Sequence, residues 1–125
     1  MLLVALGGAL GAVARYTLSG LVHRIASPFF PWGTLVVNLA GCAVFGAIAG
    51  VAESRGAVGP EARAFLLIGV LGGFTTFSSF AFETVELLRA GNAAAAAGNV
   101  AGQVVLGLGG FWGGLTLARL VLGER

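Results

Sequence analysis

Four long apolar stretches fill most of this sequence, and short polar segments separate them. A helix of about 20 predominantly apolar residues crosses the hydrocarbon core of a bilayer. Backbone polar groups inside lipid must be paired, and a helix pairs them within one segment. We therefore predict an all-α membrane protein with four transmembrane helices, at about residues 2–22, 33–51, 64–88 and 94–122.

Composition excludes a water-soluble fold. Only 10% of the 125 residues are charged, whereas soluble domains average about 25%. The four stretches use up the chain, so we expect a single transmembrane domain over residues 1–125, surrounded by membrane lipid. The sequence is apolar from Leu2 onward with no basic segment before it, which favours a retained first helix over a cleaved signal peptide.

Glycines within the apolar stretches form pairs spaced four residues apart, which places both members of a pair on one helix face. Lipid gives little hydrophobic drive for helix association, and small residues let helix backbones approach closely instead. The pattern predicts dense helix packing and a homodimer. The pairs are Gly7 and Gly11, Gly46 and Gly50, Gly69 and Gly73, Gly98 and Gly102, and Gly110 and Gly114.

Charged residues give only a weak signal for orientation in the membrane. Segment 53–63, which we expect to be a solvated loop, would lie on the same side as both termini. Cytoplasmic segments normally hold an excess of Arg and Lys, but here the two sides differ little. A weak bias is compatible with insertion in both orientations, and so with an antiparallel dimer. The two sides carry Arg55, Arg63, Arg119 and Arg125 against Arg24 and Arg89.

The run Gly72-Gly73-Phe74-Thr75-Thr76-Phe77-Ser78-Ser79-Phe80 falls in the middle of the third stretch. Paired glycines and paired β-branched threonines both weaken a helix, so we predict a break there. Carbonyls freed at membrane depth are tolerated where they are buried or line a polar cavity, and such breaks recur at ion sites. Phe77 and Phe80 would share a face, with two hydroxyls beside them. The alternative is a glycine-rich packing bend with ordinary core phenylalanines.

Two polar residues in the first two stretches are further candidates. Asn38 lies inside the second stretch, with Thr34 four residues earlier on the same face. Its amide must find a partner inside the protein and can donate to an anion, although bonding between helices is the alternative. Arg15 lies toward the end of the first stretch, where it either reaches the headgroups or makes an electropositive vestibule.

Taken in order along the chain, the runs GGALGAVARY, GTLVVNLAG and GVLGGFTTFSSF resemble the CrcB, or Fluc, family of fluoride channels. The resemblance implies a dual-topology antiparallel homodimer with two pores in the inner (plasma) membrane. It implies passive export of fluoride, which protects the cell against fluoride toxicity. It also implies one sodium ion buried at the centre of the dimer.

Residue roles follow from the same resemblance. Phe77 and Phe80 match the pore-lining phenylalanines, and Asn38 matches the pore asparagine. Gly72 and Thr75 match the positions whose carbonyls hold the sodium ion. A phenyl ring has a positive edge, so ring edges can replace water around a small anion without trapping it. Polar positions near the path or its vestibule are matched by Thr34, Ser78, Ser79 and Arg15.

The fourth stretch departs from the family pattern. The family often places hydroxyl residues there at a spacing of four, whereas the matching face here carries Asn99, Gln103 and Gly107. We predict that the two amides act as the polar track, since each amide carries two N–H donors. The alternative is that they bond to neighbouring helices or to the Asn38 amide.

Other functions fit the sequence less well. A proton-coupled drug exporter with four helices and dual topology needs a titratable group at mid-membrane, but Glu83 and Glu86 lie near the end of the third stretch. A non-transporting assembly protein leaves the Thr-Thr-Phe-Ser-Ser-Phe run unexplained. We expect no enzyme, because no set of nucleophile, base and orienting group is visible. The scattered arginines form no nucleic-acid patch, and the single His23 and Cys42 form no zinc cluster or disulfide.

Overall fold

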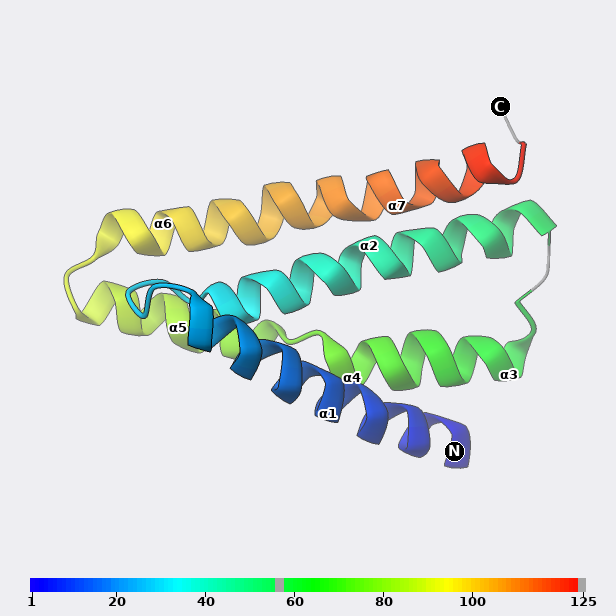
Figure 1. The fold of residues 1–125 in the computed structure, drawn as a ribbon, viewed down its shortest axis with the longest axis horizontal. Coiled ribbons are helices and arrows are strands. Elements are labelled where there is room, and N and C mark those ends of the chain that lie inside the picture. Colours follow the sequence, from blue (N-terminus) through cyan, green and yellow to red (C-terminus); the bar gives the residue numbers. More distant parts are fainter. Residues whose placement is uncertain (56–57, 124–125) are drawn as a thin grey trace.

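The computed structural model describes residues 1–55 and 58–123, and every regular element in these ranges is helical. The long helices form an elongated bundle, and the start of the first helix and the end of the last lie at the same end of it (Figure 1). The elements are α1 (Leu2–Ile25), α2 (Trp32–Arg55), α3 (Pro60–Arg63), the π-helix η1 (Ala64–Leu71), α4 (Gly72–Phe74), α5 (Phe77–Arg89), α6 (Ala93–Ala101), the π-helix η2 (Gly102–Leu106) and α7 (Gly107–Val121).

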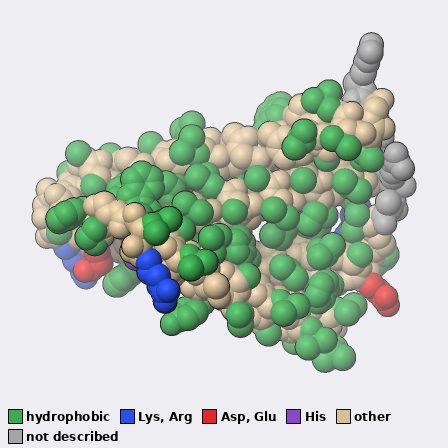
Figure 2. Space-filling view, viewed as in Figure 1, with side chains coloured by type: hydrophobic (Ala, Val, Ile, Leu, Met, Phe, Trp, Pro, Cys, Tyr) green, Lys and Arg blue, Asp and Glu red, His purple; other side chains and the backbone are tan. Residues whose placement is uncertain are grey.

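Four stretches within the described residues are long and apolar enough to cross a membrane: Leu2–Ile25, Trp32–Glu53, Pro60–Arg89 and Ala93–Val121. The four predicted spans are therefore confirmed. At most 33% of the most apolar part of any span is buried within the protomer, and hydrophobic side chains are spread over the whole face seen in Figure 2, with few charged ones among them. Lipid or a partner protein must cover such a surface, so the chain is a multi-pass integral membrane protein.

The predicted loop over 53–63 was wrong at both of its ends. Helix α2 continues to Arg55, and α3 begins at Pro60. Proline is favoured at the first position of a helix, because its missing N–H has no helical partner there. The charged residues of this segment therefore extend the two spans beyond their apolar parts.

Glycines hold α2 directly against α7. A side-chain carbon at Gly46 would collide with the carbonyl of Phe111, and one at Gly114 would collide with the carbonyl of Ala43. At Gly50 the added carbon would lie 2.8 Å from the β-carbon of Ala118. Only glycine permits this approach, so the paired glycines set the distance between the second and fourth spans.

A second close contact joins the first and third spans. A side-chain carbon at Gly11 would collide with the carbonyl of Val70, and one at Gly73 would lie 2.5 Å from the carbonyl of Gly8. Helix α1 consequently packs against η1 and α4, next to the point where α4 ends (Figure 1).

Two extended residues separate α4 from α5. Thr75 has φ −79° and ψ 156°, and Thr76 has φ −150° and ψ 116°. The glycines before them stay helical, and α5 begins at Phe77. The Thr76 hydroxyl caps α5 by accepting a hydrogen bond from the backbone N–H of Ser79 at 3.2 Å. A β-branched residue tolerates an extended backbone well, and its hydroxyl then starts the next helix.

Candidate functional site

Asn38 on α2 bonds to the extended backbone of Thr76 through both ends of its amide. Its Nδ2 donates to the Thr76 carbonyl at 2.9 Å, and its Oδ1 accepts from the Thr76 N–H at 2.8 Å. A buried backbone group without a partner is costly. The side chain of Asn38 thus supplies the partner that the Thr76 N–H lacks, adds a second bond to the Thr76 carbonyl, and fixes α2 to this point of the chain.

Two backbone carbonyls that the sequence analysis singled out, those of Gly72 and Thr75, lack their helical hydrogen-bond donors. In an uninterrupted helix the Gly72 carbonyl would accept from the Thr76 N–H, which here donates to Asn38. The Thr75 carbonyl would accept from the Ser79 N–H, which here donates to the Thr76 hydroxyl. Both carbonyls therefore lose the donor that a helix supplies, and Gly72 itself is exposed at the protomer surface.

A cavity of about 410 Å³ lies beside the Asn38 amide and is lined by Phe77, Phe80 and Gln103 among others. The two phenyl rings meet edge to face, with centroids 5.3 Å apart and planes at 66°. Ring edges carry partial positive charge and ring faces carry negative charge. The cavity thus combines an aromatic wall with amide groups, which suits a small anion that has lost part of its water.

Gln103 belongs to this cavity and also bonds to Asn38. Its Oε1 accepts from Asn38 Nδ2 at 3.0 Å. Its Nε2 is buried and has no hydrogen-bond partner among the described residues. The oxygen is held by Asn38, so both N–H donors of Gln103 remain available to a ligand.

Asn99 is placed differently from Gln103. It is fully buried, at 0% exposure, and donates to the hydroxyl of Thr84 at 2.9 Å. In the described part of the chain, Asn99 lines neither this cavity nor the larger one that follows. Gly107 is the third position of the helix face that carries Asn99 and Gln103. It lies against Cys42, because a side-chain carbon added at Gly107 would lie 3.6 Å from the Cys42 sulfur. Only Gln103 of this face is brought to the aromatic cavity.

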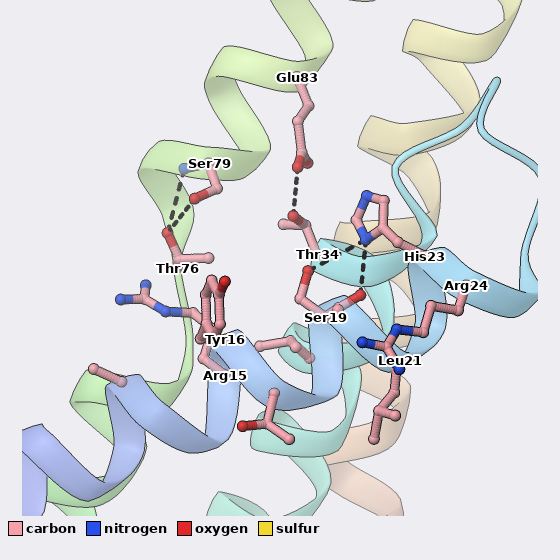
Figure 3. Close-up of a pocket in the computed structure, with 14 residues that line it drawn as sticks. Arg15, Tyr16, Ser19, Leu21, His23, Arg24, Thr34, Thr76, Ser79 and Glu83 are labelled. Atoms are coloured by element: carbon pink, nitrogen blue, oxygen red, sulfur yellow. Dashed lines mark hydrogen bonds between the residues drawn. The ribbon is translucent and has the colours of Figure 1, made fainter.

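A larger cavity of about 730 Å³ opens between α1, α2 and the start of α5 (Figure 3). Arg15 and Arg24 line it from α1, and Ser79 lines it from α5. Two cations at its wall attract anions. Thr76 lines both cavities, so the extended pair stands between a basic vestibule and the aromatic site.

Hydroxyl groups cluster around Thr76 at this boundary. Its hydroxyl lies 3.1 Å from that of Ser79 and 3.3 Å from that of Ser78. Ser79 lines the larger cavity, while Ser78 is exposed. The structure therefore brings both serines to the extended pair, with only Ser79 lining the larger cavity.

Glu83 is the site residue that the sequence analysis missed. Thr34 donates to its Oε1 at 2.6 Å, and both residues line the larger cavity (Figure 3). The other oxygen of Glu83 is buried without a partner among the described residues. Thr34 and Glu83 are 49 positions apart in the sequence, and no local pattern marks such a pair.

Comparison with known proteins gives a consistent result along nearly the whole chain. The family model described as "CrcB-like protein, Camphor Resistance (CrcB)" matches residues 2–115. The fluoride-specific ion channel FluC of Nitratidesulfovibrio vulgaris is 48% identical over 121 residues, which cover 97% of this chain and 98% of that protein. The proteins of the same description from Opitutus terrae (52% over 113 residues, 89% and 86% covered) and Paracoccus denitrificans (51% over 116 residues, 93% and 91% covered) are also similar.

Proposed function

The chain belongs to the CrcB family, and we propose that it is a fluoride-specific ion channel that exports fluoride passively across the inner (plasma) membrane and so protects the cell. The observation that carries this proposal is the cavity lined by Phe77 and Phe80 together with the amides of Asn38 and Gln103. The family is one of channels, which is not an enzyme class.

The cavity supports selective and rapid passage for physical reasons. Fluoride is small and strongly hydrated, so entry requires groups that replace water. Ring edges and the two unengaged N–H donors of Gln103 replace it by several weak contacts, and weak contacts at more than one position let the ion leave again. Arg15 and Arg24 raise the local concentration of anions at the vestibule without standing in the aromatic cavity.

We extend the proposal to the break and to a sodium ion. The extended pair Thr75–Thr76 would lie near mid-membrane, since it falls near the middle of the span Pro60–Arg89. The carbonyls of Gly72 and Thr75 lack their helical donors, and hard oxygen ligands suit Na⁺. Two carbonyls make an incomplete site, so a second copy would supply the other two. Such an ion would add positive potential near the anion path.

The proposed assembly is therefore an antiparallel homodimer. Much of each span is apolar and exposed in one protomer, and Gly72 is exposed where a second copy could approach closely. The test is a cysteine appended to the amino terminus in a Cys42→Ser background, labelled in intact cells with an impermeant maleimide. Labelling of about half of the sites from each side supports dual topology, and labelling from one side alone contradicts it.

Glu83 gives a reason to keep a second function under test. A carboxyl group in the larger cavity is what a proton-coupled drug exporter would use. Proteoliposomes carrying an acid-inside pH gradient should accumulate no cationic drug if the channel proposal is correct. Proton-driven uptake of such a drug would favour the exporter.

The direct experiment measures fluoride and chloride efflux in parallel from proteoliposomes containing the purified chain. Fluoride should leave rapidly, and chloride should leave no faster than from protein-free liposomes. Equal rates for the two anions would contradict the proposed selectivity.

A further inference from the structure

Asn99 on α6 is the most deeply buried polar side chain in the described part of the protomer, at 0% exposure. Buried polar side chains in proteins are normally hydrogen-bonded. Its Nδ2 donates to the Thr84 hydroxyl at 2.9 Å, which joins α6 to α5. The contact lies away from both cavities, so it calls for an explanation other than contact with the permeating ion.

The direction of this hydrogen bond is determined by its neighbours. The Thr84 hydroxyl has one proton, and it donates that proton to the carbonyl of Phe80 at 2.8 Å. Towards Asn99 the hydroxyl can therefore only accept. A continuous chain of two hydrogen bonds thus runs from the amide of Asn99 to the backbone of Phe80.

One helical turn further along the fourth span, a second amide reaches the other end of the same segment. Gln103 accepts from Asn38, and Asn38 holds the N–H and the carbonyl of Thr76. Asn99 holds Thr84. The fourth span is thereby connected to the third both before and after the two phenylalanines.

From this arrangement we infer that Asn99 is a positioning residue for Phe80, acting through Thr84. The inference rests on the proposed fluoride-channel function. The bond chain fixes the depth and rotation of the first two turns of α5 against α6, and so keeps Phe80 at the wall of the aromatic cavity. Asn99 itself does not contact fluoride. Its amide holds α6 against α5 and is not part of the polar track.

Four variants test this inference by fluoride efflux from proteoliposomes. Asn99→Leu and Thr84→Val should each lower the rate by about tenfold, the factor that corresponds to one lost hydrogen bond of a buried group. The double variant should be no slower than either single variant, because both remove the same interaction. Thr84→Ser retains the hydroxyl and should transport at the wild-type rate. Thr116→Val, an exposed change on α7, is the matched control and should also be neutral.

A readout independent of transport accompanies the flux. Amide hydrogen exchange of residues 77–84 should be faster in Asn99→Leu and Thr84→Val than in wild type, and unchanged in Thr84→Ser. Absence of fluoride flux in wild type would overturn the proposed function, while exchange would still report on the bond chain.

Three results would overturn the inference. The first is wild-type flux in Thr84→Val together with slow flux in Asn99→Leu, which would make Asn99 a direct donor to the ion. The second is a multiplicative loss in the double variant. The third is unchanged hydrogen exchange in both single variants. If Asn99→Leu does not insert into the membrane, the two Thr84 variants decide the question. Thr84→Val must then slow fluoride flux and speed hydrogen exchange, and Thr84→Ser must leave both unchanged.

Discussion

Replacing Asn38 by leucine should destabilise the protein measurably, because the substitution removes three hydrogen bonds at once. The N–H and the carbonyl of Thr76 would then face an aliphatic side chain, and Thr76 is buried. Thr76 is the N-cap of α5, so its carbonyl keeps the first intrahelical bond and only its N–H is left without a partner; one such buried group gives a loss of about 1–3 kcal/mol. The oxygen of Gln103 also loses its donor, but this loss adds little to the cost, because water in the adjoining cavity can solvate the oxygen.

The loss is measured by unfolding in mixed micelles with a rising fraction of SDS, followed by the fluorescence of Trp32 and Trp112. Asn38→Asp is the informative second variant. It keeps an oxygen that accepts from the Thr76 N–H, but it loses both donor bonds and places a charge at membrane depth, so we expect a stability loss at least as large as that of Asn38→Leu. Its negative charge should also abolish fluoride efflux. Val44→Leu, an exposed change on the same helix, is the control and should unfold as wild type does.

Two results would refute this reasoning. If Asn38→Leu unfolds at the same SDS fraction as wild type, the extended pair does not depend on Asn38. If Asn38→Asp transports fluoride at an undiminished rate, the amide does not face the permeating ion. The first result tests whether Asn38 stabilises the extended pair, and the second tests whether it lies near the fluoride path, so the two roles are tested separately.

Three further predictions concern flux and packing. Phe77→Ile and Phe80→Ile should each slow fluoride efflux at least tenfold while the dimer still forms on size exclusion, because isoleucine has no positive edge; full-speed efflux would show that neither ring contacts the permeating ion. Gln103→Leu should lower efflux, whereas Gln103→Ser, which keeps a donor, should retain it; an unaltered rate in the leucine variant would take Gln103 off the path. Gly114→Val should prevent stable insertion, because its side chain meets the carbonyl of Ala43; expression at the wild-type level would show that α2 and α7 can separate.

The number and places of the spans could be predicted from the sequence because lipid imposes one length and one polarity on every crossing. The Thr75–Thr76 pair, where the backbone is extended, falls inside the run that the sequence analysis singled out. The ends of the spans were harder to predict, since charged residues such as Arg55 prolong a helix into water without any apolar signal.

Contacts between spans could not be predicted, because the rotation of each helix about its axis was unknown. A span that is apolar all round carries little amphipathic pattern to orient it. The bond between Asn38 and Gln103, 65 positions apart, was therefore named only as an alternative to the polar track. The π-helical segment η2 adds to the difficulty, since it shifts the register of the fourth span at Gln103 itself. The pairing of Thr34 with Glu83 was missed for the same reason.

The contact between α2 and α7 has a consequence for how the chain is made. Spans leave the ribosome in order, so α2 enters the bilayer while its partner is still to be translated. Until α7 arrives, the surface around Gly46 and Gly50 has nothing of the right shape against it. A message cut short before Gly107 would therefore yield a chain with three inserted spans and an open groove. The close packing of α2 is thus completed only when α7 has been translated.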